Sequence, residues 1–89
     1  MYLAKVRGTV VSTQKDPRLV GFKLLITQRI DTKGGYLGEP GVSVDTVGAG
    51  VGETVIVTSG SSARFAAEQP DSPIDSTIVG IVDNTEVEA

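Results

Sequence analysis

The run from residue 44 to residue 64, VDTVGAGVGETVIVTSGSSAR, constrains the fold more than any other part of the chain. Residues 42–47 and 55–58 are rich in valine, isoleucine and threonine, and β-branched side chains favour extended backbone over helix. Between these two segments the three glycines of GAGVG permit positive φ angles, so the chain can reverse tightly there. We therefore expect two short strands joined by a glycine turn.

The glycine segment admits three interpretations. GAGVG resembles part of a dinucleotide-binding fingerprint, but that motif needs a strand before it, a helix after it and a third correctly spaced glycine. Here a strand is expected to follow, and no lysine follows as in a phosphate-binding loop. The remaining interpretations are a hairpin turn and a backbone loop that presses against another subunit.

A second group of small residues follows the second strand, at Gly60, Ser61, Ser62 and Ala63. A turn needs only one or two residues of this kind. Four small residues in succession indicate a turn at which other atoms come close, so that only small side chains fit. Residues 65–75, which hold two prolines and three acids, are expected to form a loop with at most one helical turn.

The chain has 89 residues and is expected to form one domain, with an acidic tail at about residues 84–89. A domain of this size buries only about 60% of the surface of its unfolded chain, so its own core is thin. The sequence has no cysteine for disulfides and no histidine or cysteine for a zinc site. A partner subunit is the remaining common stabiliser, and we expect an oligomer.

The missing residue types also exclude several kinds of catalysis. Without histidine there is no Ser-His-Asp arrangement, and without cysteine there is no thiol nucleophile. We expect no catalytic residues, no metal and no cofactor, and we assign Asp45 and Asp75 only to accepting backbone N–H bonds in turns. No leader and no long apolar run indicates secretion or membrane insertion, so the expected location is cytoplasmic.

Charge is unevenly distributed along the chain. Residues 1–33 carry seven basic and two acidic side chains, and residues 34–89 carry one basic and nine acidic ones, for a net charge of −3. A basic half admits nucleic-acid binding, but the chain has only two tyrosines and two phenylalanines to stack on bases. The basic residues alternate with apolar ones, which favours a solvated strand face; an electrostatic edge that meets a complementary neighbour is the other interpretation.

Three further segments have the pattern of strands: residues 2–12, 22–30 and 77–82. Glycines inside two of these patterns, Gly8 and Gly80, indicate the bends or bulges that a small barrel needs to close. Apolar residues occupy both faces at residues 24–26, which indicates burial against the core and against another element or subunit. Residues 31–41 have the composition of a loop. Five short strands without a convincing helix predict an all-β fold, a small five-stranded closed β-barrel.

Five segments carry a resemblance to a known family. They are MYLAKVRGTVVSTQK, LVGFKLLI, VDTVGAGVGETVIV, SGSSAR and PIDSTIVGIVD, in this order. On these residues the chain resembles the pentameric vertex shell proteins of bacterial microcompartments, of the EutN/CcmL type. The resemblance runs from Met1 to about Asp83, and GAGxGE combined with GSSAR is far more specific than either motif alone.

The resemblance implies an OB-fold-like barrel without enzymatic activity that assembles as a cyclic pentamer. Such homopentamers would cap the five-fold vertices of a polyhedral protein shell that encloses metabolic enzymes in the bacterial cytoplasm. The implied partners are further copies of the chain and hexameric shell facet proteins, with no nucleic acid and no membrane. Both a carboxysome and a catabolic compartment fit the resemblance.

The resemblance also assigns residues to assembly. Five copies of one loop converge at a five-fold axis, where only small side chains fit, so the five-fold pore candidates are Gly60, Ser61 and Ser62. Arg64 is the only basic residue after Lys33 and is expected to pair with a carboxylate or carbonyl across a subunit interface. The alternative for Arg64 is a surface ion pair, worth about 0–1 kcal/mol. The subunit or facet interface candidates are Gly48, Ala49, Gly50, Gly52, Glu53 and Arg64.

Two other functions compete with the shell role. An oligonucleotide-binding module of the OB-fold type shares the barrel class, but such modules use aromatic platforms in a positive groove, and this chain is acidic. A small enzyme or ligand-binding barrel would have to use its carboxylates, which the sequence does not pair.

Overall fold

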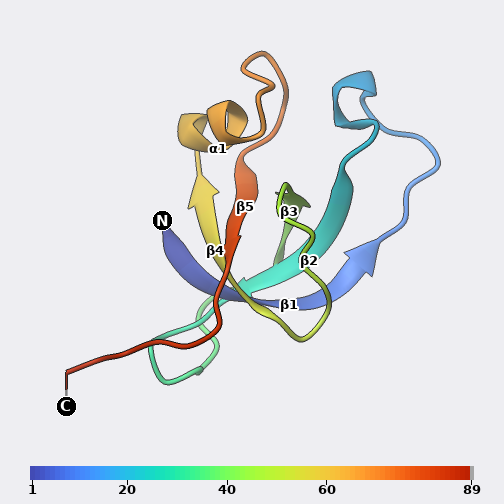
Figure 1. The fold of residues 1–89 in the computed structure, drawn as a ribbon. Helices are drawn as coiled ribbons and strands as arrows, with labels where there is room; N and C mark the ends of the chain where they lie inside the picture. Colours follow the sequence, from blue (N-terminus) through green and yellow to red (C-terminus); the bar gives the residue numbers. More distant parts are fainter. Residues whose placement is uncertain (89) are drawn as a thin grey trace.

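The computed structural model describes residues 1–88, which form a small β-barrel with one short α-helix (Figure 1). The strands are β1 (Tyr2–Val10), β2 (Lys23–Arg29), β3 (Gly41–Asp45), β4 (Thr54–Ser59) and β5 (Ser76–Ile81). They close into a barrel in the order β1-β2-β3-β5-β4. The predicted closed five-stranded barrel is therefore confirmed, and each predicted strand is present with bounds shifted by one or two residues.

The predicted hairpin between β3 and β4 is wrong. β3 is antiparallel to β2 and, through Val44 and Asp45, parallel to β5. β4 pairs with β1 and with β5, antiparallel to both. Because β5 lies between β3 and β4, residues 46–53 reverse the chain across one end of the barrel and join two strands that do not pair with each other.

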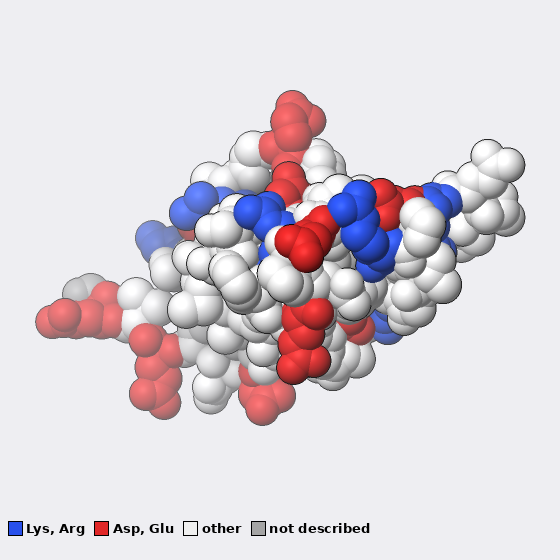
Figure 2. Space-filling view, turned by 90° about the horizontal axis from the view of Figure 1, so that it is seen from above, with Lys and Arg blue, Asp and Glu red and all other residues white. Residues whose placement is uncertain are grey.

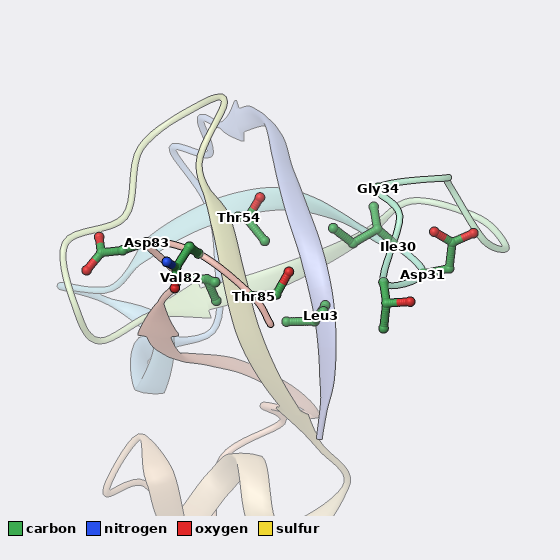
Figure 3. Close-up of a pocket in the computed structure, with 10 residues that line it drawn as sticks. Leu3, Ile30, Asp31, Gly34, Thr54, Val82, Asp83 and Thr85 are labelled. Carbon is green, nitrogen blue, oxygen red and sulfur yellow. The ribbon is translucent and has the colours of Figure 1, made fainter. Parts of the chain in front are cut away.

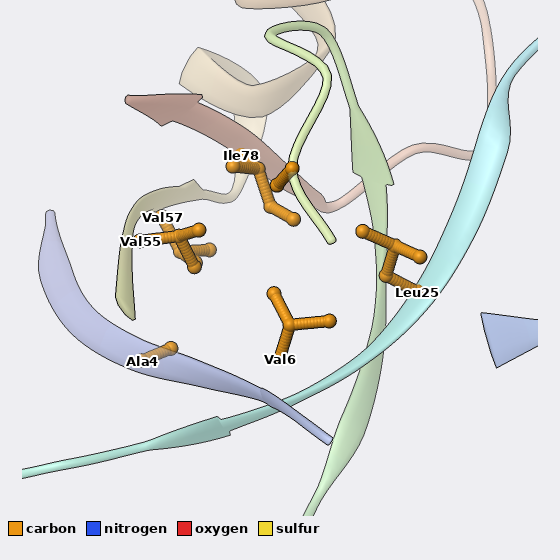
Figure 4. Packing of buried hydrophobic residues seen from close by; sticks show 7 residues of the cluster. Ala4, Val6, Leu25, Val55, Val57 and Ile78 are labelled. Atoms are coloured by element: carbon orange, nitrogen blue, oxygen red, sulfur yellow. The ribbon is translucent and has the colours of Figure 1, made fainter. Parts of the chain in front are cut away.

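Alternate side chains of the strands fill the barrel (Figure 4). Ala4 and Val6 of β1 point inward and are fully buried, whereas Leu3 and Lys5, which alternate with them, are only partly buried. This confirms the predicted alternation along β1. The remaining members of the buried cluster are Leu25, Ala49, Val55, Val57 and Ile78. The core is therefore aliphatic, and it includes one residue of the glycine segment.

The two glycines inside strands lie beside irregularities in the sheet, as predicted. The pairing of β1 with β2 shifts register between Val6 and Gly8, and that of β4 with β5 shifts between Ile56 and Val57. A Cβ atom at Gly80 would lie 3.2 Å from Cδ1 of Ile56. Glycine therefore lets the neighbouring isoleucine pack over the bend.

Residues 60–66 are not the turn and loop that the sequence predicts, because Ser61–Ala66 form helix α1. Gly60 precedes the helix with φ 68° and ψ −147°, a conformation that is essentially restricted to glycine. Ala63 and Ala67, one helical turn apart, pack into a second buried cluster with Val44 and Ile74. Leu19, Phe22 and Leu24 pack against this cluster. Small side chains on one face thus bring α1 close to the outer wall of the barrel.

The two longer connections before β3 are ordered by specific contacts. The 3-10 helix η1 (Pro17–Leu19) begins at Asp16, whose carboxylate accepts the backbone N–H of Arg18. In residues 31–40, the Tyr36 ring lies 4.5 Å from the Arg7 guanidinium. The Gln28 side chain donates to the Gly38 carbonyl at 2.8 Å. The second connection therefore folds back onto the outer face of β1 and β2.

The chain beyond β5 leaves the barrel. The Val82 N–H donates to the Thr54 carbonyl at 2.9 Å, and residues 83–88 then continue without helix or strand. Figure 1 shows this segment pointing away from the barrel, beside residues 31–40. No helix within residues 1–88 is long and apolar enough to span a membrane.

Candidate assembly surfaces

The connection between β3 and β4, residues 46–53, contains the GAGVG sequence and is the glycine segment. A buried carboxylate holds its start. Asp45 accepts hydrogen bonds from the backbone N–H groups of Val47, Gly48 and Ala49, at 3.0 to 3.1 Å. This confirms the turn-forming role predicted for Asp45. The side chain of Lys23, on the neighbouring strand β2, lies 3.7 Å from the same carboxylate and also donates to the Ala49 carbonyl. The sequence reading missed this role of Lys23.

The far end of the glycine segment is fixed just as firmly. The Gly50 N–H donates to the Glu53 carboxylate at 2.7 Å. Val6 of β1 donates its N–H to the Glu53 carbonyl at 3.0 Å and accepts from the Gly52 N–H at 2.8 Å. The segment is therefore a preformed surface whose shape is set within one subunit.

The glycine segment exposes a mixture of backbone and apolar side chains. Val51 is 62% exposed and Val47 is 39% exposed. Gly48 and Gly52 have positive φ angles and are open to solvent, with no atom near the position of a Cβ. Ala49, by contrast, is fully buried in the barrel core, so its side chain is not available for the contact that the sequence predicts.

The pore candidates lie at the start of α1. Gly60, Ser61 and Ser62 are all exposed, and the side chains of the two serines leave the surface small and polar. Gly60 donates its N–H to the Asp75 carbonyl at 3.0 Å, which ties the start of the helix to the chain before β5. The sequence predicts that the Asp75 carboxylate accepts a backbone N–H bond in a turn. In the structure the backbone carbonyl of Asp75 accepts the bond from Gly60.

Arg64 lies in α1, two residues after Ser62. It is partly buried, and its guanidinium lies 3.5 Å from the Ile74 carbonyl of the same chain. The contact is at the outer limit of hydrogen-bond distance, so most of the five-donor capacity of the guanidinium is left for other acceptors.

The two predicted groups of assembly residues lie at opposite ends of the barrel. The glycine segment precedes Thr54 at the start of β4, and Gly60 follows Ser59 at its end. Figure 1 shows α1 at one end and the β3–β4 connection toward the other. The structure therefore brings Arg64 next to the pore candidates and separates it from the glycine segment.

Sequence reasoning did not identify an apolar depression on the outer face of β2 and β3. A hollow of about 190 Å³ is lined by Leu19, Leu24, Val42, Val44, Pro73 and Ile74, together with the polar residues Asp75 and Ser76 where β5 begins. A second hollow, of about 270 Å³, adjoins it at Val42, which is 50% exposed. The available signal was the run of apolar residues on both faces of β2 at residues 24–26. Apolar residues on both faces predict that both faces of β2 are buried. The outer face of β2 is only partly covered within one chain.

A third hollow, of about 170 Å³, lies between Leu3, the start of the 31–40 connection and residues 82–85 (Figure 3). Its two carboxylates, Asp31 and Asp83, lie on opposite sides of the view. Asp31 already accepts backbone N–H bonds from Lys33 and Gly35. Acid–base catalysis by two carboxylates needs both groups at the reacting atom, and this hollow does not present such a pair.

Charged side chains are mixed over the surface more than the sequence halves suggest. Figure 2 shows Lys and Arg in a band across the face in view, with Asp and Glu beside them, and Asp and Glu alone at its lower left. Asp16 and Arg18 form one such neighbouring pair, with 2.7 Å between carboxylate and guanidinium. Within residues 1–88 no three His, Cys, Asp or Glu side chains cluster as a metal site.

The described residues thus form a closed barrel with the glycine segment at one end, the start of α1 at the other and apolar hollows on its outside, an arrangement that suits a structural protein that assembles with other chains. The chain belongs to the family described as "Ethanolamine utilisation protein EutN/carboxysome", whose family model matches residues 1–83.

Three curated relatives share about half of their residues with this chain. The shell vertex protein GrpN of Rhodospirillum rubrum (strain F11) is 55% identical over 86 residues, which cover 97% of each chain. The carboxysome shell vertex protein CcmL of Synechocystis sp. PCC 6803 is 52% identical, covering 98% of this chain and 87% of its own. PduN of Salmonella typhimurium (strain LT2), another microcompartment shell vertex protein, is 51% identical, covering 93% and 96%.

Solved structures agree with these relatives. The pentameric microcompartment shell protein GrpN from Rhodospirillum rubrum superposes with a TM-score of 0.87 at 53% identity, covering 100% of both chains. An ethanolamine utilization protein, EutN, gives a TM-score of 0.93 at 42% identity, covering 98% of this chain and 91% of its own. The predicted family, the structural role in a microcompartment shell and the assignment as a non-enzyme are confirmed. The comparisons do not support the oligonucleotide-binding alternative.

Proposed function

We propose that five copies of this chain form a closed ring and that the ring fills the five-fold vertices of a polyhedral microcompartment shell. The observation that carries the proposal is the match over the whole chain to a solved pentameric shell protein, at 53% identity. The role is structural: the ring closes a corner that flat facets leave open.

The surface of the isolated barrel supports self-assembly. Val42 and Phe65 are each at least half exposed, in a chain of 89 residues whose core is made of aliphatic side chains. Burying such side chains against a second copy stabilises both subunits, at about 25 cal/mol for each Å² of apolar surface removed from water. A cyclic ring does this with two different surfaces of each subunit, one facing each neighbour.

Gly60, Ser61 and Ser62 are proposed to lie nearest the five-fold axis. They are small, exposed and adjacent at the start of α1, so five copies can approach one another there without a clash. Arg64 follows on the same helix and has donors to spare beyond its long contact with Ile74. It is the candidate for an interaction with a carboxylate or carbonyl of the neighbouring subunit.

The glycine segment is proposed to meet the hexameric facet proteins that surround a vertex. Gly48, Gly50, Gly52 and Glu53 belong to it, and it lies at the end of the barrel away from α1. Its internal hydrogen bonds hold it in shape without a partner, which lowers the entropy lost on binding. If the pore candidates face the axis, this end is free for a second type of contact.

The vertex role is tested by co-expressing a hexamer-forming facet protein with and without this chain. Closed polyhedral particles that contain the chain, and open sheets or tubes without it, are the expected result in electron micrographs. Closed particles that form equally well and exclude the chain would contradict the proposal.

The Gly50→Val variant tests the contact with the facet protein without disturbing the fold. Gly50 has an ordinary φ, and an added Cβ would meet only the flexible Glu53 side chain, at 3.4 Å. We expect the variant to form rings but to enter shells poorly. Gly8→Ala is the control, because Gly8 also has an ordinary φ and its added Cβ would meet only the Ile26 side chain, at 3.4 Å, inside β1. If the Gly50→Val variant enters shells normally, the glycine segment only connects β3 to β4 and does not contact the facet protein.

A further inference from the structure

The ring contact has one prominent projecting side chain. Phe65 of α1 is 70% exposed, although aromatic side chains of its size are usually largely buried. Aromatic residues, phenylalanine among them, are enriched at the cores of protein interfaces. Phe65 is therefore the strongest candidate for a side chain that contacts a neighbouring subunit.

Helix geometry fixes the direction in which Phe65 points. Successive residues of an α-helix are about 100° apart around its axis, so Phe65 lies about 160° from both Ala63 and Ala67. Ala63 and Ala67 face the second buried cluster, with Val44 and Ile74. Phe65 therefore projects from the side of α1 opposite that cluster.

The cluster is open to the outside at the hollow on β2 and β3. Leu19, Leu24, Val44 and Ile74 belong to the cluster or pack against it, and the same four side chains line the hollow of about 190 Å³. An apolar cavity of about 150 Å³ is enough to hold a benzene molecule. The hollow thus has the size and the chemistry to accept one phenyl ring.

We propose that the Phe65 ring of one subunit inserts into the hollow bounded by Leu24, Val42 and Ile74 on the next subunit around the ring. This inference rests on the proposed ring and names the contact that holds it together. Phe65 projects away from the buried cluster, and the hollow opens from that same cluster on β2 and β3, so each subunit can give its phenyl ring to one neighbour and receive one from the other. That is the head-to-tail arrangement a cyclic assembly requires.

The placement also agrees with the pore candidates. Ser61 is four residues before Phe65 and shares its exposed helix face. A subunit boundary that runs along this face would bring Ser61 toward the axis and carry Phe65 into the adjoining subunit. Val42, at the open edge of the hollow, would lose its exposure in the same contact.

Two measurements test the contact, starting from the unmodified protein as a pentamer in native mass spectrometry. Phe65→Ala is expected to raise the protomer concentration at which half of the rings dissociate by about thirtyfold or more, since a lost aromatic anchor costs about 2 kcal/mol or more. Val11→Ala is the matched control, because Val11 is also a large exposed apolar residue but lies beyond the end of β1. It should leave the dissociation concentration unchanged.

The second measurement uses the absence of cysteine from the sequence. Differently tagged Phe65→Cys and Val42→Cys chains are co-expressed and treated with a short bismaleimide. A covalent dimer that carries both tags is expected, and neither variant alone nor Phe65→Cys with Val11→Cys should give one. If Phe65→Ala leaves the dissociation concentration of the pentamer unchanged and no dimer with both tags forms, the contact is wrong and the ring proposal still stands. Intact rings that no longer enter shells would assign Phe65 to a facet protein instead, and a monomeric unmodified protein would remove the contact together with the ring.

Discussion

Lys23 and Asp45 are direct cross-strand partners of β2 and β3, and their charged groups lie 3.7 Å apart at the entrance to the glycine segment. The Asp45 side chain is almost fully buried, while that of Lys23 is about half exposed. The carboxylate holds three backbone N–H groups, and the ammonium group bridges it to the Ala49 carbonyl. This pair converts a glycine-rich sequence into a segment of fixed shape.

Asp45→Ala should therefore destabilise the fold strongly. Three N–H groups would lose a charged acceptor, and we expect a loss of about 3 kcal/mol in the free energy of unfolding. Lys23→Met, which keeps the apolar stem, should cost about 1 kcal/mol because Lys23 is partly solvated. Urea unfolding at one fixed protomer concentration gives both values. Equal losses for the two variants would contradict the central position of Asp45.

Gly80→Ala should destabilise the barrel by about 1 kcal/mol through overpacking. The added Cβ would lie 3.2 Å from Cδ1 of Ile56 on the neighbouring strand. Ile56→Val removes that methyl group, so the double variant should lose less stability than the sum of the single variants. Gly8→Ala is the matched comparison, because its added Cβ would meet Ile26 at 3.4 Å, and it should be close to neutral. Thermal unfolding of the four variants decides this.

Gly60→Ala should cost about 2 kcal/mol, because its φ of 68° and ψ of −147° are strained for any residue with a Cβ. Gly41→Ala, at an ordinary φ with nothing close to the added atom, should cost much less. Circular dichroism during urea unfolding measures the difference. A Gly60→Ala variant as stable as Gly41→Ala would show that the start of α1 adapts to the new residue.

Asp16 should titrate at unusually low pH. Its hydrogen bonds with the Arg18 side chain and backbone N–H lower the pKa of Asp16 to about 2. Because the folded pKa is below the unfolded value of 3.8, the pair stabilises the fold above pH 3.8, and that contribution is lost as the pH falls toward 2. Carboxyl NMR titration should find this pKa, and Arg18→Ala should raise it toward its ordinary value. A normal pKa in the unmodified protein would contradict the pairing.

The strands were predictable from the sequence because they depend on local preferences. Alternating burial along β1 follows from the order of its residues, and the bends at Gly8 and Gly80 follow from glycines inside strand patterns. The turn role of Asp45 was also predictable, since aspartate readily accepts backbone N–H groups just after a strand.

Pairing between strands was not predictable in the same way. The glycines of residues 48–52 suit a hairpin locally, but β5, which arrives later in the chain, takes the place between β3 and β4. Ala49 is buried only because the segment crosses the end of the barrel. The family resemblance assigned residues 48–53 to a contact surface as a group, and the local sequence carries no sign that the Ala49 side chain turns into the core.

Helix α1 was missed because its sequence carries weak local signals. Serines, a glycine and small residues favour turns, and a helix of six residues is not stable by itself. The spacing of Ala63 and Ala67 was the available signal, since residues four apart share a helix face. Packing of that face against Val44 and Ile74 supplies the stability that the local sequence lacks.

The native mass of the purified protein tests the central claim most directly. Native mass spectrometry at micromolar protomer concentration should give a species near 46 kDa, five times the chain mass of 9.2 kDa. A mass near 9.2 kDa at the same concentration would contradict the ring and the contacts proposed to close it.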